Sequence, residues 1–520
     1  DIVSFMAAPA SPQLDGPSRY WEDVPDEYNL KLTEITGALP QGLTGTLYRN
    51  GSGRWNVGES RVDSLFDADG MVVAFAIDGD GVRFKNRFVR TEHYLTTTAA
   101  GRMVKRGFAY QRPGGMRANA FRLPANTANT NVMIGQDRLL ALWEGGRPHG
   151  LDLDTLNTIG MCSLDGVLKG PIGAYSAHYT YDATTDSRVN FGFEPYFPRL
   201  DLRHIRNAPT REEKIRRLRE LAGEAIPRVR LRLYETDSSG ATRYLRAVPL
   251  PGMGLLHDMA LTPRYAVFML SPLRINPWAL LGRQTYWDAI KFKQNEPSYF
   301  ILAPRDGGKV RTIETDPFYM WHYANAYEDG ADVVVELPRF APETFGGMQA
   351  WAADSRSDMT QLYRDVAAED VPDTVRLTRF RITPDDRVLA EPLAQMGCEF
   401  PQIDQRRSTQ PHAVTYVTVP SDGEGSGEGI GRFNHADGSV QTYCPAGHKL
   451  VEPIFVPRPD SAAEADGWVL TVGYDEAQHR SRLMVFDAPH IDAGPIAEAW
   501  LPFHLPMSYH GAFTDRVARF

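Results

Sequence analysis

The stretch MVVAFAIDGDGVRFKNRFV, residues 71–89, is the clearest indication of how this chain folds. An apolar run at 71–77 precedes Asp78-Gly79-Asp80-Gly81, and a second strand-like run follows at 82–89. Asp-Gly pairs tolerate the positive φ angles of a tight turn, so this pattern predicts a β-hairpin. Comparable strand patterns recur at 374–382, 468–472 and 482–486.

Short strands and turns extend over the whole chain and predict an all-β protein. Asp-Gly pairs punctuate the full length, and the 37 prolines disfavour long helices. These features are typical of a sandwich, a barrel or a propeller, and no exact repeat selects among the three. No Gly/Ser-rich or Pro-rich linker divides the sequence, so we expect one domain over residues 1–520.

One charged helix interrupts the strand pattern. Thr210 precedes it, and Glu213 follows three residues later, which is a capping-box spacing. Ile215, Leu218 and Ala222 then recur at helical intervals before Gly223. The sequence therefore predicts a helical insertion around 199–232, lying on the β body.

Composition excludes several classes of function and location. The formal net charge of the 520 residues is −9 and no Lys/Arg-rich run occurs, which argues against nucleic-acid binding. Three cysteines are too few for a disulfide framework and favour a reducing, cytoplasmic location. The first residues lack the pattern of a signal peptide, and no window is long and apolar enough to span a bilayer.

A second excursion places bulky apolar residues beside a proline, at Pro277, Trp278, Leu280 and Leu281. One interpretation is a loop buried in the core. The other is an exposed apolar tip, which would give a peripheral contact with a membrane or guard the mouth of a tunnel. The sequence leaves both interpretations open.

Four histidines have sequence neighbours that favour a fixed side-chain position. They are His178, His257, His322 and His510, separated by 79, 65 and 188 residues. This spacing excludes a compact zinc-finger clip, so only a large scaffold can bring them together. Four neutral imidazoles suit a borderline transition metal such as iron, although each one alone is more often a structural histidine. Six others lie in probable loops and are expected at the surface: His149, His204, His435, His448, His479 and His490.

Three glutamates in apolar surroundings are candidate partners for these imidazoles. Glu144 ends an apolar run at 139–143, and Glu399 and Glu452 also lie among apolar residues. A carboxylate in such a place needs a reason, and imidazole ligands commonly donate their second ring N–H to a carboxylate. The alternative is that each glutamate faces water from an edge strand.

Nine short strings resemble the carotenoid cleavage oxygenase family, and two longer stretches, 112–121 and 139–148, look closest to bacterial apocarotenoid oxygenases. They run in family order over nearly the full chain, whereas the insertion near 199–232 has no clear counterpart. The strings are LYRNG at 47–51, FDADGM at 66–71, ANTN at 128–131, LLALWE at 139–144, SAH at 176–178, HD at 257–258, EFP at 399–401, EPIFVP at 452–457 and HG at 510–511.

The resemblance implies a fold and a metal site. The fold would be a seven-bladed β-propeller capped on one face by loops and short helices. The four histidines would be the ligands of a catalytic Fe(II) on the propeller axis, and Thr130 would lie near an open coordination position. The implied second-layer pairs are Glu144 with His257, Glu399 with His322 and Glu452 with His510, leaving His178 without a glutamate.

The resemblance also implies a reaction. A non-haem Fe(II) dioxygenase would cleave a C=C double bond with O2 to give two carbonyl products. The alkene supplies the electrons, so no second cofactor is needed, and no nucleotide-binding glycine fingerprint is present. The implied partners are O2 and an apolar polyene, with retinal formed by 15,15′-type cleavage of an apocarotenoid.

A stilbenoid or phenylpropenoid substrate is the alternative. Family members that cleave these compounds typically have a lysine immediately before the first of the three glutamates, and this chain has Trp143 there. Loss of the cation argues against a phenolate. Tyr110, which corresponds to a phenol-contacting tyrosine of those enzymes, keeps the alternative open. A metal-free propeller that only binds an apolar ligand, and a retinoid isomerase on the same scaffold, are two further hypotheses.

Overall fold

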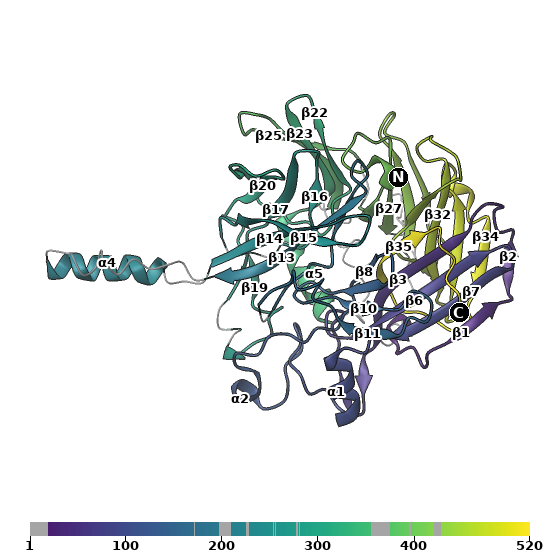
Figure 1. The fold of residues 1–520 in the computed structure, drawn as a ribbon, viewed down its shortest axis with the longest axis horizontal. Coiled ribbons are helices and arrows are strands. Elements are labelled where there is room, and N and C mark those ends of the chain that lie inside the picture. The colour runs from purple at the N-terminus through teal and green to yellow at the C-terminus, as the bar shows by residue number, and fades with distance from the viewer. Residues whose placement is uncertain are drawn as a thin grey trace, which may run out of the picture.

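The computed structural model describes residues 19–170, 172–196, 210–224, 228–252, 254, 256–276, 279, 281–354, 375–394, 397–420 and 428–520. Within these residues the strands form antiparallel blades, and the short inner strands of neighbouring blades lie against one another, β8 and β31 on β35 and β12 and β22 on β16. The molecule is a seven-bladed β-propeller, which confirms the expected fold (Figure 1).

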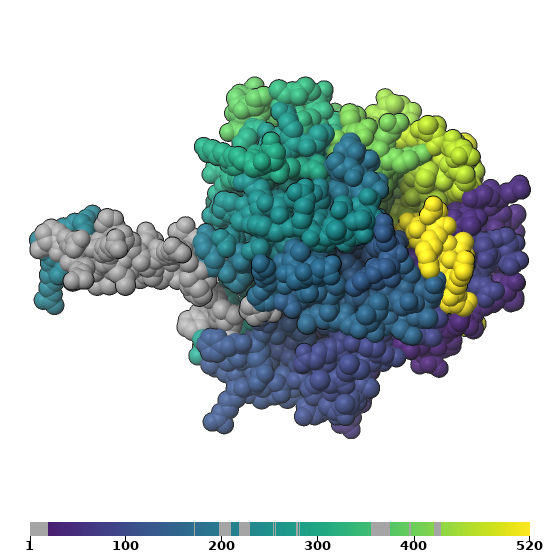
Figure 2. Space-filling view, viewed as in Figure 1, coloured from purple at the N-terminus to yellow at the C-terminus, as the bar shows by residue number. Residues whose placement is uncertain are grey.

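The two ends of the chain build the first blade together. Its strand order is β1 (Asn29–Leu32), β7 (Gly81–Phe88), β6 (Asp69–Asp78), β3 (Gly45–Arg54) and β35 (Ser508–Thr514). The inner strand β35 comes from the C-terminal end of the chain and pairs with β3, with Thr46 opposite Thr514. Figure 2 shows C-terminal residues, in yellow, lying between the purple surface of this blade and the blue surface of the next. This pairing closes the ring of blades and leaves only short, protected strand edges.

The second to fifth blades are four-stranded and follow one another along the chain, each starting with its inner strand. The second contains β8 (Asn131–Ile134), β9 (Leu139–Leu142), β10 (His149–Leu151) and β11 (Thr158–Met161). The third contains β12 (Thr180–Asp182), β13 (Ser187–Tyr196), β14 (Arg228–Thr236) and β15 (Thr242–Pro249). The fourth contains β16 (Ala260–Leu261), β17 (Tyr265–Leu270), β20 (Ser298–Pro304) and β21 (Arg311–Thr315). The fifth contains β22 (Asn325–Asp329), β23 (Asp332–Phe340), β24 (Val375–Ile382) and β25 (Val388–Pro392).

The sixth and seventh blades share one ten-stranded sheet. The sixth contains β26 (Glu399–Gln402), β27 (Val414–Pro420), β28 (Glu428–Asn434) and β29 (Val440–Tyr443). The seventh contains β31 (Ile454–Pro457), β32 (Gly467–Asp475), β33 (Arg480–Asp487) and β34 (Ala497–Trp500), with β2 (Ile35–Gly37) on its outer edge. The short strand β30 (His448–Leu450) pairs with both β28 and β32 and joins the two blades.

Short helices and hairpins lie outside the blades, and Figure 1 shows α1 and α2 on the same side of the propeller. We call the segments on that side the cap. The helices are α1 (Glu92–Ala100), α2 (Gly115–Asn119), α5 (Phe345–Ala353), η1 (Arg19–Trp21), η3 (Pro342–Thr344), η4 (Gln405–Arg407) and η5 (Ile491–Ala493). The hairpins pair β4 (Asn56–Val57) with β5 (Ser60–Arg61) and β18 (Leu273–Ile275) with β19 (Ile290–Phe292).

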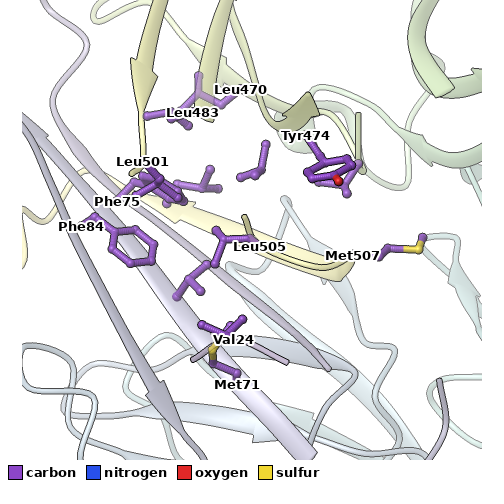
Figure 3. Close-up of a cluster of buried hydrophobic side chains, with 14 of the residues drawn as sticks. Val24, Met71, Phe75, Phe84, Leu470, Tyr474, Leu483, Leu501, Leu505 and Met507 are labelled. Atoms are coloured by element: carbon purple, nitrogen blue, oxygen red, sulfur yellow. The ribbon is translucent and has the colours of Figure 1, made fainter. Parts of the chain in front are cut away.

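Apolar side chains fill the seam where the first and seventh blades meet (Figure 3). Phe75 and Phe84 come from the N-terminal hairpin, and Leu470 and Leu483 come from β32 and β33. All four are fully buried, and burying each such side chain contributes about 1.5–3 kcal/mol. This packing stabilises the joint between the two ends of the chain.

The strand predictions are confirmed. The hairpin at 71–89 is β6 and β7, the segment 374–382 contains β24, and the pair at 468–472 and 482–486 is β32 and β33. Each prediction depended on local turn chemistry and two-residue alternation, which survive in the fold because the strands of each hairpin are adjacent in sequence.

The predicted helix exists as α4 (Arg211–Glu224), inserted between the two central strands of the third blade. Thr210 Oγ1 accepts from the backbone N–H of Glu213 at 3.1 Å, as the capping pattern predicts. The expectation that the helix lies on the β body is wrong, because α4 stands clear of the propeller (Figures 1 and 2). The insertion also ends earlier than 232, since β14 begins at Arg228.

Pro277, Trp278 and Leu280 lie outside the described residues, and Leu281 is half-buried. Among the residues that the structure describes, no helix has the length and apolar character needed to cross a membrane. No disulfide joins Cys162, Cys398 and Cys444, all of which are among the described residues, and of the three only Cys398 is fully buried.

Candidate metal centre

Each of the seven inner strands brings one polar side chain to the axis at or near its first residue. Because the inner strands all run in the same direction along the propeller axis, their first residues lie together at one end of the axis. The side chains, in blade order, are Thr130 before β8, His178 before β12, His257 before β16, His322 before β22, Glu399 on β26, Glu452 before β31 and His510 on β35. Among the predicted metal ligands and their glutamate partners, only Glu144 comes from another position, just after β9.

The four predicted histidines meet. The ring centroid of His178 lies 4.2 Å from that of His257, 5.0 Å from that of His322 and 4.7 Å from that of His510. The Nε2 atoms of His257 and His322 are 3.3 Å apart. Three of the rings are buried and His257 is largely so. The fold therefore brings together four imidazoles from four different blades.

Two of the imidazoles are held by carboxylates in the expected pairs. His322 Nδ1 lies 2.5 Å from Glu399 Oε2, and His510 Nδ1 lies 2.9 Å from Glu452 Oε1. Glu452 also accepts from the backbone N–H of Gly511 at 2.9 Å. An ionised carboxylate can only accept, so Nδ1 carries the proton and the Nε2 lone pair is left facing the axis.

Glu144 lies between two imidazoles. Its Oε1 atom is 3.4 Å from His257 Nδ1, as expected, and 3.1 Å from His178 Nε2. We expected His178 to have no glutamate nearby, so this proximity differs from the sequence-based interpretation. Both atoms of the closer contact are buried and make no hydrogen bond.

Burial shifts the pKa values of these groups in opposite directions. It raises the pKa of Glu144 to about 7 and that of Glu399 to about 8, and it lowers the pKa of His178 to about 4. Desolvation penalises every charged form here, because the acids and bases are buried together. A divalent cation among the Nε2 atoms would favour ionised carboxylates and neutral imidazoles, so the residues present fit a metal ion.

Side-chain bonds to the backbone of the next blade hold the inner strands in register. Asn131 on β8 donates to the carbonyl of Ala177 at 2.9 Å, next to His178. Asp258 follows His257, and its two oxygens accept from the backbone N–H groups of Met259 at 2.6 Å and Tyr323 at 2.8 Å. Asp258 thereby ties the segment of His257 to that of His322. Sequence reasoning noted Asp258 only as part of a motif and missed this role.

Aromatic side chains surround the histidines toward the cap. Trp321 packs edge-on against His257 with centroids 5.0 Å apart, and Phe400 stacks on His322 at 4.9 Å. Trp287 lies next to Trp321, and Phe66 lies 4.9 Å from Trp287. Sequence reasoning did not single out these four rings, although Trp321 and Phe400 are sequence neighbours of His322 and Glu399.

The other predicted residues lie close to this region. Thr130 is half-buried, and its hydroxyl contacts Asn129 Oδ1 at 3.2 Å. The indole of Trp143 lies over the Gly145-Gly146 turn, where a Cβ on either glycine would stand 3.1 Å from the ring. Tyr110 is half-buried and lies on a cap segment rather than on an inner strand.

A second buried group of histidines lies between the fifth and sixth blades. Glu336 on β23, His412 before β27 and His435 after β28 bring ligand-type atoms within 4.8 Å of one another. The expectation that His435 and His149 lie at the surface is wrong, because both rings are buried. Their sequence neighbours indicate loops, whereas burial here results from the packing of neighbouring strands and blades.

Comparison with known proteins agrees with this geometry. Residues 21–515 match the family described as retinal pigment epithelial membrane protein (RPE65). This chain belongs to the RPE65 family of carotenoid oxygenases. It is 32% identical to apocarotenoid-15,15'-oxygenase of Synechocystis, with 96% of each chain covered. It is also 27% identical to resveratrol cleavage oxygenase 1 of Aspergillus fumigatus, covering 98% of this chain and 96% of that one.

Solved structures of Synechocystis apocarotenoid oxygenase share the fold. A threonine-to-alanine mutant superposes with a TM-score of 0.80 at 30% identity, covering 96% of this chain and all of that chain. The cobalt-substituted form gives a TM-score of 0.79 at 31% identity, covering 95% and 98% of the two chains. That relative therefore binds cobalt.

Proposed function

We propose that this protein is a non-haem Fe(II) oxygenase that cleaves one C=C bond of an apocarotenoid, with 15,15′-type cleavage that forms retinal. The observation that carries the proposal is the meeting of His178, His257, His322 and His510, with Nδ1 of two rings held by buried carboxylates. This arrangement leaves neutral nitrogen donors facing one point, which is what a borderline transition metal requires.

Iron would supply the ability to activate O2 next to a bound alkene. The four imidazoles would hold it, and the three glutamates would keep the rings in the donating tautomer. Four protein ligands would leave room for O2 at the iron, and Thr130 would lie near an open coordination position. In the overall reaction both oxygen atoms of O2 enter the products, and one double bond becomes two carbonyl groups.

The surroundings of the metal centre favour an apolar, uncharged substrate. Trp143, Trp321 and Phe66 each keep part of their surface accessible, so the cap side is not packed solid. Aromatic rings bury apolar surface well, and an uncharged polyene makes no demand for a cation. The similarity to an apocarotenoid oxygenase over nearly the full chain supports the same choice.

Stilbenoid cleavage remains the second candidate because named relatives include a resveratrol cleavage oxygenase and a lignostilbene dioxygenase. Trp143 is the position that separates the two substrates. It offers one N–H donor and no cation, so a phenolate bound there would lack a charged partner. Tyr110 alone supplies at most a neutral hydrogen bond.

The test is a product analysis by mass spectrometry with a panel of apocarotenals and hydroxystilbenes under O2. We expect retinal and a second carbonyl fragment from an apocarotenal, with O2 consumed. Cleavage of hydroxystilbenes alone would contradict the substrate proposal and leave the chemistry intact. A geometric isomer formed without O2 uptake would contradict the chemistry. Trp143→Lys serves as the matched variant, and we expect it to lose apocarotenal cleavage and gain stilbenoid binding.

We also propose that the cap contacts a membrane surface, from which the substrate enters, and that the protein works in the cytoplasm at that surface. Leu95, Met116, Phe121 and Leu123 are exposed on or near α1 and α2, with Phe121 retaining 77% of its accessible surface. Exposed apolar side chains gathered on one side of a protein can mark a binding surface. Vesicle flotation should recover the protein, and Phe121→Glu with Leu123→Glu should abolish the recovery. Unchanged flotation of that variant would contradict this part of the proposal.

A further inference from the structure

A cavity of about 440 Å³ with both polar and apolar side chains in its wall reaches the histidines. His178, His322 and His510 line its inner end, and the exposed side chain of Gln405 and the half-buried Thr514 line it farther out. None of the aromatic rings toward the cap except Phe400 takes part in its wall. The cavity runs beside the inner strands, whereas the aromatic rings of Trp321, Trp287 and Phe66 lie on another side of the histidines, outside its wall.

Hydrogen-bonded side chains follow the cavity wall from its surface end to the histidines. Gln405 Nε2 donates to Gln402 Oε1 at 3.4 Å, and Gln402 Nε2 donates to Glu452 Oε1 at 2.9 Å. Glu452 in turn accepts from His510 at 2.9 Å. A hydrated ion in this cavity meets polar partners over its whole path.

The charges along the cavity become more negative toward the inner end. Arg406 near the mouth is neutralised by Asp404 at 2.6 Å, and Arg188 lies over the ring of Tyr181. At the inner end the wall includes the buried carboxylates of Asp258 and Glu452, and only the latter has an arginine close by, Arg49 at 3.6 Å. A cation therefore moves toward lower potential as it goes inward.

The approach from the cap has the opposite character. Trp321, Trp287 and Phe66 form a chain of rings leading from His257. Stripping water from a divalent ion among such rings has a free-energy cost of many kcal/mol, because they offer it no strong ligand. An apolar polyene has no such penalty.

We propose that the cavity lined by His178, His322 and His510 is the route by which the hydrated divalent metal ion enters and leaves the site, separate from the route of the apolar substrate. This proposal rests on the proposed function, since it needs the histidines to bind a metal. It makes a kinetic prediction. Narrowing a route slows entry and exit by the same factor and leaves the equilibrium affinity unchanged, whereas damage to the ligands changes the affinity.

The experiment measures uptake of Co²⁺ by metal-free protein in a stopped-flow spectrometer, and its release to a chelator. Thr514→Trp narrows the mouth, and Gln405→Lys places a cation there without adding much bulk. We expect each to slow uptake by roughly 10-fold, within the range of steering effects. The slowing by Gln405→Lys should shrink at high salt. Matched controls are Ala99→Trp and Ala99→Lys on α1 of the cap, which should leave both rates unchanged.

Each outcome is decisive. Equal slowing of uptake and release by Thr514→Trp, with unchanged affinity, supports the route. Unchanged rates in both cavity variants, or equal slowing by the Ala99 variants, overturn it while leaving the metal centre standing. Failure of the wild-type protein to bind Co²⁺ overturns the proposed function itself. Should Thr514→Trp not fold, the salt-dependent effect of Gln405→Lys still decides.

Discussion

The molecule contains two buried groups built from the same two residue types, histidine and glutamate, in different surroundings. The axial group unites four imidazoles with three carboxylates. The group between the fifth and sixth blades unites His412 and His435 with Glu336. The carboxyl oxygen of Glu336 lies 3.3 Å from Nε2 of His412 and 3.7 Å from Nε2 of His435. By residue type and distance alone, both groups qualify as metal sites.

The two groups differ in the hydrogen-bond partners of their histidine Nδ1 atoms. In the second group, His435 Nδ1 lies 3.0 Å from Nη2 of Arg379, and a guanidinium can only donate. His412 Nδ1 lies 3.1 Å from Nδ2 of Asn325, whose amide orientation is fixed because Oδ1 accepts from the N–H of Thr409. Both Nδ1 atoms therefore accept, so both protons are on Nε2.

A proton on Nε2 occupies the lone pair that a metal would need. In the axial group the carboxylates of Glu399 and Glu452 place the proton on Nδ1 instead. The comparison teaches that the partner of the second ring nitrogen, and not the number of histidines, determines whether a cluster binds metal. The geometry therefore favours metal binding at the first group and a hydrogen-bonded network at the second.

The largest expected effect is on metal content. His257→Ala should abolish tight binding of iron, whereas His435→Ala should leave the iron content per chain unchanged. Elemental analysis of the purified proteins measures both. Full iron content in His257→Ala, or a loss of iron in a folded His435→Ala protein, would break the comparison.

Removal of a carboxylate charge should weaken metal binding by about 10–100-fold, the usual size of such effects. We expect Glu399→Gln to reach the upper part of this range, because Glu399 lies 2.5 Å from His322 Nδ1. Glu144→Gln should have a smaller effect, since Glu144 lies 3.4 Å from His257 Nδ1. Competition with a calibrated chelator gives both affinities, and the reverse order would contradict the geometry.

We expect Asp258→Asn to change the geometry of the metal centre, although Asp258 is not one of the predicted ligands. Both of its partners are N–H donors, so Asp258→Asn turns an NH₂ group toward either Met259 or Tyr323. One lost and opposed hydrogen bond costs about 1–3 kcal/mol. We expect a shifted ligand-field spectrum of the Co²⁺ form. Asn86→Asp, a change at a buried side chain on β7 that bonds to the backbone of Asp26 and Tyr28, controls for general destabilisation and should leave that spectrum unshifted.

A further expected effect is on stability in acid. Burial lowers the pKa of His412 from 6.5 to about 3, so the folded state resists protonation that the unfolded chain accepts. Stability from this group is present above pH 6.5 and is lost as pH falls toward 3, at about 1.4 kcal/mol per pH unit. Denaturant unfolding at several pH values should show a shallower decline in His412→Gln than in the wild-type protein. Parallel declines would argue that His412 is not buried in its neutral form.

Local patterns in the sequence predicted the parts of the fold that depend on local chemistry. The hairpin at 71–89 and the cap of α4 at Thr210 follow from turn and capping residues adjacent in sequence. The number of blades does not follow from such signals, because β35 pairs with β3 from the other end of the chain. It came from the resemblance to a family, as did the pairing of glutamates with histidines.

Predictions from the sequence failed for residues whose burial or role depends on segments far away in the chain. His435 lies beside an asparagine and an alanine in sequence and was expected at the surface, but Arg379 and Glu336 of another blade enclose it. Asp258 was missed because its role depends on a backbone N–H of the following blade. The position of Asp258 directly after His257, a candidate ligand, is the one sequence signal that would have singled it out.

The most direct test of the account is an anomalous-difference map from crystals of the iron-loaded protein, recorded at the iron absorption edge. The account predicts one strong peak at bonding distance from the Nε2 atoms of His178, His257, His322 and His510, and none beside Glu336. A peak between His412 and His435, or no peak on the axis in a protein that retains iron, would contradict it.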